Sequence, residues 1–191
     1  MEALLVSTGA VALAEIGDKT QLLAFVLAAR FKKPLVVVAG ILAATLLNHG
    51  LAGALGAWVA TALSPPTMRW LLGLSFLGMA LWTLIPDKLD AKAIPACAWG
   101  VFGATFVTFF LAETGDKTQL ATATLAAHYA APLWVVAGST LGMLLADAPA
   151  VYAADKLAHC IPLRLVRAVA AAVFAALGVA TLAGAGASLG L

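Results

Sequence analysis

Two short stretches of the sequence carry nearly the same run of polar residues inside apolar surroundings. The first reads EIGDKTQ over residues 15–21, and the second reads ETGDKTQ over residues 113–119. Their donor atoms are carboxylate, hydroxyl and amide oxygens, which Ca²⁺, Mg²⁺ and Mn²⁺ accept as ligands, whereas softer ions favour sulfur or imidazole. The two stretches, called the first and second motif below, therefore predict a site for a hard divalent cation.

The spacing inside each motif suggests how these ligands are arranged. On a regular helix Glu15, Asp18 and Gln21 lie three positions apart and project from one side, and the second motif repeats this spacing. Gly17 would permit either a close helix contact or local unwinding. We expect the two stripes to meet around one ion. The predicted ligands are Glu15, Asp18, Gln21, Glu113, Asp116 and Gln119, with Thr20 and Thr118 as supporting neutral oxygens.

Each motif also contains a lysine, Lys19 or Lys117, which we expect to balance and orient the acids because an ammonium group repels a cation. Lys19 lies four residues after Glu15 and could pair with it or with Asp18. The four acids and two lysines together carry a charge of −2, which one divalent cation or two protons would neutralise. Because burial favours the neutral form of a carboxyl group, we expect protons to compete with metal. The alternative is an ion-pair network that only holds helices together, but it would not need two extra negative charges.

The remaining sequence indicates an all-α membrane protein. Hydrophobic residues make up 63% of the 191 residues, charged residues make up 10%, and the mean hydropathy is +1.03, whereas a soluble domain has about 25% charged residues. Six apolar stretches are close to or longer than the roughly 20 residues that cross a bilayer. They cover residues 3–29, 34–63, 69–86, 95–127, 132–160 and 163–189.

The two halves of the chain are copies of each other. A shift of 98 residues places residues 14–22 on 112–120 with eight of nine identical, and it also aligns Pro34 with Pro132. Each copy holds three predicted helices, an odd number, so the copies must cross the membrane in opposite directions. We therefore predict two inverted three-helix repeats, residues 1–92 and 93–191, in one membrane domain. Secondary transporters have this architecture, with the site near the membrane midplane.

Basic residues predict the orientation in the membrane. They occur at residues 30–33, 88–92 and 156–167 in or beside three loops, whereas the opposite side holds only Arg69. By the positive-inside rule these loops face the cytoplasm, so both termini lie outside. The first stretch has no basic segment before it and contains Glu15, so it is read as a helix of the mature protein. A net charge of +2 without a basic run gives no indication of nucleic-acid binding.

Further polar residues occur at helix depth outside the motifs. The 98-residue shift places His49, which follows Asn48, on Asp147. His49 and Asp147 could support the acids as a second layer or as a proton relay. Hydrogen bonding between helices would explain them equally well.

The doubled motif resembles that of a family of manganese and calcium cation transporters, whose members carry two E-x-G-D-[KR]-[TS] motifs in inverted three-helix halves. Both motifs are complete here, at residues 15–20 and 113–118, and the resemblance covers essentially the whole chain. The family includes small bacterial manganese exporters and eukaryotic Golgi Mn²⁺/Ca²⁺ transporters. The resemblance implies that the acids of both motifs bind the cation and that protons are exchanged for it. The short link between the halves favours the bacterial type, but the family does not fix the preferred metal.

We therefore expect a transporter, not an enzyme, that exports Mn²⁺ or Ca²⁺ from the cytoplasm in exchange for protons, in the inner membrane of a bacterium. The expected partners are the cation, protons and the lipid bilayer; no cofactor is expected, and an oligomer is compatible with the sequence. An intramembrane enzyme lacks support because there is no H-E-x-x-H pair. Export of organic solutes, or a channel, is a further alternative, but clustered acids would repel anions and the motifs lack aromatic walls for organic cations.

Overall fold

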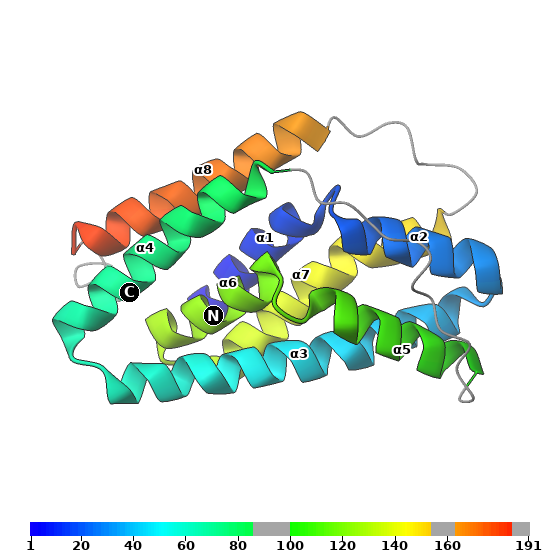
Figure 1. The fold of residues 1–191 in the computed structure, drawn as a ribbon, viewed down its shortest axis with the longest axis horizontal. Coiled ribbons are helices and arrows are strands. Elements are labelled where there is room, and N and C mark those ends of the chain that lie inside the picture. Colours follow the sequence, from blue (N-terminus) through cyan, green and yellow to red (C-terminus); the bar gives the residue numbers. More distant parts are fainter. Residues whose placement is uncertain (86–99, 154–162, 185–191) are drawn as a thin grey trace.

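The computed structural model describes residues 1–85, 100–153 and 163–184, which form eight helices and no strand (Figure 1). The prediction of an all-α protein is confirmed for these ranges. The predicted boundary between residues 92 and 93 lies outside the described residues, as do the basic residues Lys88, Lys92 and Lys156. The helices are α1 (Glu2–Glu15), α2 (Lys19–Phe31), α3 (Pro34–Ala62), α4 (Pro65–Thr83), α5 (Gly100–Glu113), α6 (Lys117–Tyr129), α7 (Pro132–Tyr152) and α8 (Leu163–Leu182).

Two helices in the described part, α3 and α7, are long and apolar enough to cross a membrane. They contain 29 and 21 residues, against the roughly 20 that a bilayer requires. Helix α5 and residues 168–182 of α8 are also apolar but shorter. Six membrane spans in inverted halves therefore remain a prediction.

The regular helix on which the stripe of ligands was placed is interrupted in each motif, by the local unwinding that Gly17 was expected to permit. Helix α1 ends at Glu15 and α2 begins at Lys19, and the second motif is broken at the equivalent place, between α5 and α6 (Figure 1). Gly17 and Gly115 lie in the breaks with φ angles of 81° and 79°. This left-handed conformation costs other residues about 1 to 2 kcal/mol, whereas glycine adopts it freely. A single glycine in each motif thus allows one expected helix to become two.

Helices α3 and α7 begin at equivalent prolines, as the aligned Pro34 and Pro132 predict. Each proline lies in the first turn of its helix, where the missing N–H group loses no hydrogen bond. The preceding helices α2 and α6 end in residues with left-handed backbone, Lys32 with φ 53° and Ala130 with φ 49°. The two halves therefore turn back on themselves with the same local geometry.

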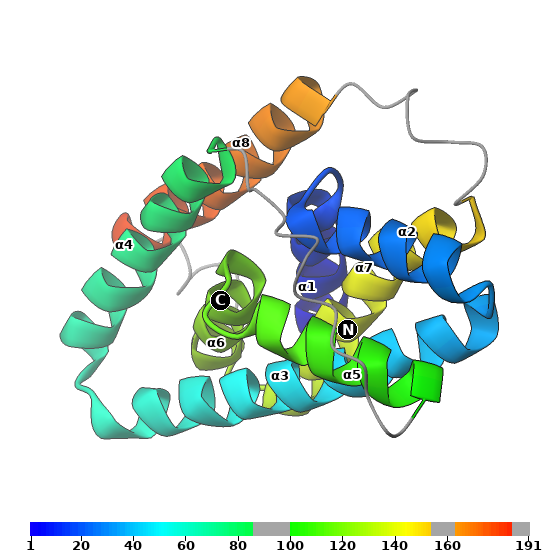
Figure 2. The same ribbon diagram turned by 45° about the vertical axis from the view of Figure 1, so that its right-hand side comes forward.

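Helix α1 packs against α7 in the same way as α5 packs against α3 (Figures 1 and 2). A Cβ atom added to Gly138 would lie 2.4 Å from the carbonyl oxygen of Leu4, and one added to Gly40 would lie 3.1 Å from that of Phe102. Both residue pairs are related by the 98-residue shift. Small residues let helix backbones approach closely in membrane proteins, and these two equivalent contacts both join the first half of the chain to the second. Helices α4 and α8 pair with each other.

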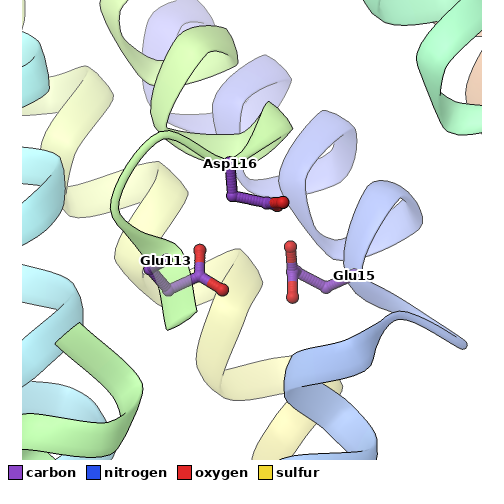
Figure 3. Close-up of side chains that lie close together, drawn as sticks. All are labelled: Glu15, Glu113 and Asp116. Atoms are coloured by element: carbon purple, nitrogen blue, oxygen red, sulfur yellow. The ribbon is translucent and has the colours of Figure 1, made fainter. Parts of the chain in front are cut away.

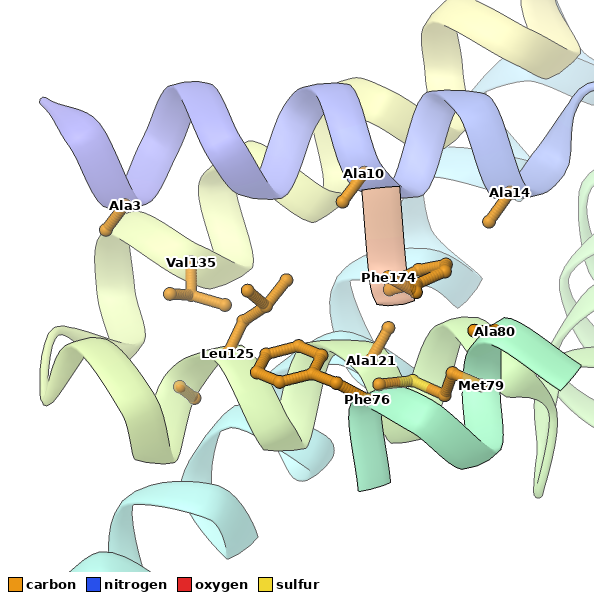
Figure 4. Packing of buried hydrophobic residues seen from close by; sticks show 11 residues of the cluster. Ala3, Ala10, Ala14, Phe76, Met79, Ala80, Ala121, Leu125, Val135 and Phe174 are labelled. Atoms are coloured by element: carbon orange, nitrogen blue, oxygen red, sulfur yellow. The ribbon is translucent and has the colours of Figure 1, made fainter. Parts of the chain in front are cut away.

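Two apolar clusters hold the broken helices. The first joins α1, α4, α6, α7 and α8, with Phe76, Met79 and Phe174 packed among alanines (Figure 4). The second joins α2, α3, α5 and α7 around Leu27 and Phe109. The two pieces of each broken helix therefore lie in different clusters, because α1 and α6 belong to the first while α2 and α5 belong to the second. Both motifs connect one cluster to the other.

Candidate metal centre

The helix breaks determine where the four acids lie. Glu15 and Glu113 are the last residues of α1 and α5, and Asp18 and Asp116 are the N-cap residues of α2 and α6. The backbone N–H of Asp18 donates to the carbonyl oxygen of Glu15 at 2.9 Å, and Asp116 donates to Glu113 at 3.0 Å. Each break is thus a tight turn that keeps one glutamate and one aspartate close together.

Carboxyl groups from both motifs meet in one place. Ligand oxygens of Glu15, Glu113 and Asp116 all lie within 4.8 Å of one another, and Figure 3 shows the three side chains turned toward a common point. The two glutamates are fully buried and Asp116 is 3% exposed. One oxygen of each carboxyl group, Oε1 of both glutamates and Oδ2 of Asp116, has no hydrogen-bond partner within the described residues. Three buried carboxyl groups that lie this close together, each with one unpaired oxygen, form an arrangement that a hard cation could fill.

Two threonines fix the orientation of the glutamates. The hydroxyl of Thr20 donates to Oε2 of Glu15, and the hydroxyl of Thr118 donates to Oε2 of Glu113 at 2.7 Å. Both hydroxyls lie five residues after the glutamate that they bind. The bonds engage one oxygen of each glutamate and leave the other for the cluster. The threonines therefore support the acids.

The lysines pair across the two motifs, so the expectation that Lys19 pairs within its own motif is wrong. The Nζ atom of Lys19 lies 2.7 Å from Oδ1 of Asp116, and Nζ of Lys117 lies 2.8 Å from Oδ2 of Asp18. Because α1 ends at Glu15 and α2 begins at Lys19, Glu15 and Lys19 do not lie one turn apart on a single helix, where i and i+4 side chains would meet. The Lys117 side chain is 5% exposed and the Lys19 side chain is 22% exposed. The two ion pairs neutralise both aspartates and leave the charge of −2 on the glutamates.

The two glutamines make equivalent bonds to the turns. Oε1 of Gln21 accepts from the backbone N–H of Gly17 at 2.9 Å, and Oε1 of Gln119 accepts from that of Gly115 at 2.7 Å. Their Nε2 groups donate to neighbouring helices, to the carbonyl oxygen of Ala146 in α7 and to Oδ1 of Asn48 in α3. Each glutamine thus ties a glycine turn to a neighbouring helix. The motif spacing did not predict the bond between Gln119 and Asn48. The one indication in the sequence was a polar asparagine within an apolar helix.

His49 and Asp147 are both fully buried. No hydrogen bond to either side chain is found in the described ranges, so hydrogen bonding between helices does not account for them there. Asp147 lies within electrostatic range of Glu15, Asp18 and Glu113. No comparable interaction with a described charged group is found for His49. The structure therefore places Asp147 near the acids.

A groove leads to the second motif. Its volume is about 360 Å³, and it lies between α3, α4 and α6. Asp116 and Gln119 are among its lining residues, together with Gly115 of the turn. The other lining residues are Leu51, Ala52, Leu55, Trp82, Leu120 and Ala123.

Comparisons with known proteins find relatives of this chain by sequence. A 52% identical protein of Vibrio cholerae is named "Putative manganese exporter", and the match covers 95% of this chain and 90% of that protein. "GDT1-like protein 3" of Oryza sativa subsp. indica is 30% identical over 91% of this chain and 71% of its own length. "GDT1-like protein 5" of Arabidopsis thaliana is 28% identical over 89% of this chain and 90% of its own length. No solved structure matches the chain.

The sequence profile of one family matches both halves of the chain separately. It covers residues 3–91 and 101–188, and its description is "Divalent cation/proton antiporter GDT1". The two matched ranges contain the two motifs, one each. The chain is thus a membrane protein of the GDT1 family of divalent cation/proton antiporters.

Proposed function

We propose that the protein exports Mn²⁺ from the cytoplasm in exchange for protons, at a carboxylate site shared by the two halves. The observation that carries the proposal is the meeting of Glu15, Glu113 and Asp116, with one unpaired buried oxygen on each. The name of the Vibrio cholerae relative supports manganese as the cargo. Ca²⁺ accepts the same oxygen ligands and is the alternative cargo.

The proposed exchange follows from the charges at the site. Both aspartates are paired with lysines, so the two glutamates hold the charge that must be compensated. Two ionised carboxylates side by side in a low-dielectric interior repel strongly, and the repulsion is removed by a divalent cation or by protons. Metal and protons therefore exclude each other at this pair, which is the condition for exchange.

Asp147 adds a fifth buried carboxylate in electrostatic range of Glu15. With a divalent cation bound between the glutamates, the charge of Asp147 would remain uncompensated, so we assign it a proton. The lysines and threonines keep the supporting roles that the sequence predicts. The glutamines hold the turns, and their role as direct ligands stays a prediction. His49, at the position of the first half that is equivalent to Asp147, is proposed as a further supporting residue.

The proposed membrane arrangement treats each broken helix as one span. α1 with α2 and α5 with α6 then form two spans, and α3, α4, α7 and α8 complete six, in inverted repeats of residues 1–92 and 93–191. Broken helices with ligands at the break are typical of transporter sites near the midplane. The orientation with both termini outside the bacterial inner membrane follows from the basic loops. An inward proton gradient would then drive metal out of the cytoplasm.

Transport by purified protein in liposomes tests the proposal. We expect Mn²⁺ flux that increases with an opposing pH gradient and is lost in both Glu15→Gln and Glu113→Gln. Glu2→Gln is the matched control, because Glu2 is an exposed acid at the start of α1. Retained flux in both glutamate variants would refute the site, and flux that does not respond to the pH gradient would refute the exchange.

A further inference from the structure

Asn48 connects α3 to both sides of the second break. Its Nδ2 donates to the carbonyl oxygen of Phe110 in α5 at 3.1 Å, and its Oδ1 accepts from Nε2 of Gln119 in α6 at 3.3 Å. Phe110 lies three residues before Glu113, and Gln119 lies three residues after Asp116. One fully buried side chain therefore bonds both helix ends that carry the acids of the second motif.

The first break lacks this bridge. The 98-residue shift places Asn48 on Ala146, whose side chain is a methyl group. Gln21 donates instead to the backbone carbonyl oxygen of Ala146, at 3.0 Å. The first turn is thus tied to the main chain of α7, whereas the second turn depends on one side chain of α3.

The break that Asn48 bridges is also the one beside the groove. Gln119 and Asp116 line the groove between α3, α4 and α6, so the second turn is not enclosed on every side. The carbonyl oxygen of Phe110 also accepts from the N–H and the hydroxyl of Thr114 inside the turn. Asn48 therefore acts on the same backbone oxygen that sets the start of the turn.

We infer that Asn48 is a positioning residue for cation binding, holding Glu113 and Asp116 at the spacing that lets them share an ion with Glu15. The inference rests on the proposed function, since it assigns Asn48 a role at the same site. A ligand set must be held to a fraction of an ångström to bind well. Removing the amide leaves Nε2 of Gln119 without its acceptor and releases the turn from α3.

Mn²⁺ transport kinetics of Asn48→Ala test the inference. Alanine is the residue at the equivalent position of the other half, and Asn48→Leu keeps the volume if the alanine variant folds poorly. We expect the apparent KM for Mn²⁺ to rise about tenfold with kcat nearly unchanged, as for the loss of a buried hydrogen-bonding group. Thr45→Ala is the control, because Thr45 is equally buried on α3 and its hydroxyl has no hydrogen-bond partner in the described ranges.

The double variant Asn48→Ala/Gln119→Ala distinguishes positioning from general damage. If the two residues act through their shared bond, the rise in KM in the double variant is smaller than the product of the two single effects. An unchanged KM in Asn48→Ala, or KM effects that multiply in the double variant, would overturn the inference. Melting temperatures of the wild type, the two single variants and the double variant separate this inference from the proposed function. Additive shifts in melting temperature would contradict the bond between Asn48 and Gln119. Absence of Mn²⁺ flux in the wild type would contradict the proposed function.

Discussion

Lys19 of the first motif binds Asp116 of the second, with 2.7 Å between Nζ and Oδ1, and Lys117 binds Asp18 in return at 2.8 Å. The pairs cross from one half of the chain to the other, so the lysine of each half neutralises the charge of the aspartate of the other half. The two glutamates, which have threonine partners instead of cations, are left to respond to metal and protons.

The two lysines should differ in their effect on stability. Lys117→Met leaves Asp18 as a buried charge without its lysine, and breaking such a pair costs about 3 to 5 kcal/mol. Lys19→Met should cost less, because the Lys19 side chain is 22% exposed and water can reach the site of the lost charge. Thermal unfolding in detergent measures both. An equal or larger loss in Lys19→Met would contradict the assigned difference in burial.

Gly115→Ala should destabilise the protein by about 1 to 2 kcal/mol, because the residue has φ 79° and alanine is strained there. An added Cβ would meet no atom within 4 Å, so the cost comes from the backbone alone. The matched control is Gly9→Ala, in the middle of α1 with the same open space. Alanine is favoured over glycine inside a helix by about 0.5 to 1 kcal/mol. Melting temperatures should therefore move in opposite directions, and a shift of the same sign in both would count against the left-handed turn.

Asp147→Asn should separate metal binding from proton coupling. The substitution keeps the shape of the protonated side chain near Glu15, so Mn²⁺ should still bind between the glutamates. The stimulation of Mn²⁺ flux by a pH gradient should fall, because asparagine cannot release or take up the proton assigned to Asp147. His49→Gln is the comparison at the equivalent position, where no acid acts on the side chain among the described residues. Unchanged stimulation in Asp147→Asn would remove Asp147 from the proton path.

The meeting of the two motifs could be predicted from the sequence, and the paths of the helices through them could not. The duplication implies two equivalent acidic segments, and the aligned Pro34 and Pro132 correctly mark the starts of α3 and α7. A glycine in an apolar run is compatible with a continuous helix or with a break, so the spacing of Glu15, Asp18 and Gln21 gave a regular stripe that does not exist.

The ion-pair partners of the lysines could not be predicted from the sequence either. Lys19 has Glu15 four residues before it, and sequence spacing alone favours that pair. The observed partner, Asp116, lies 97 residues away and is reached only because the two turns face each other. The bond of Gln119 to Asn48 has the same origin, since it depends on how α6 packs on α3.

The central claim is that Glu15, Glu113 and Asp116 hold one divalent cation together. Anomalous X-ray scattering from crystals grown with Mn²⁺ tests it most directly, because the signal locates the metal without reference to the protein. We predict one peak with Oε1 of both glutamates and Oδ2 of Asp116 at about 2.0 to 2.6 Å, the range of hard cations with oxygen ligands. A peak bound by acids of one motif alone, or no peak between the two helix breaks, would contradict a shared site.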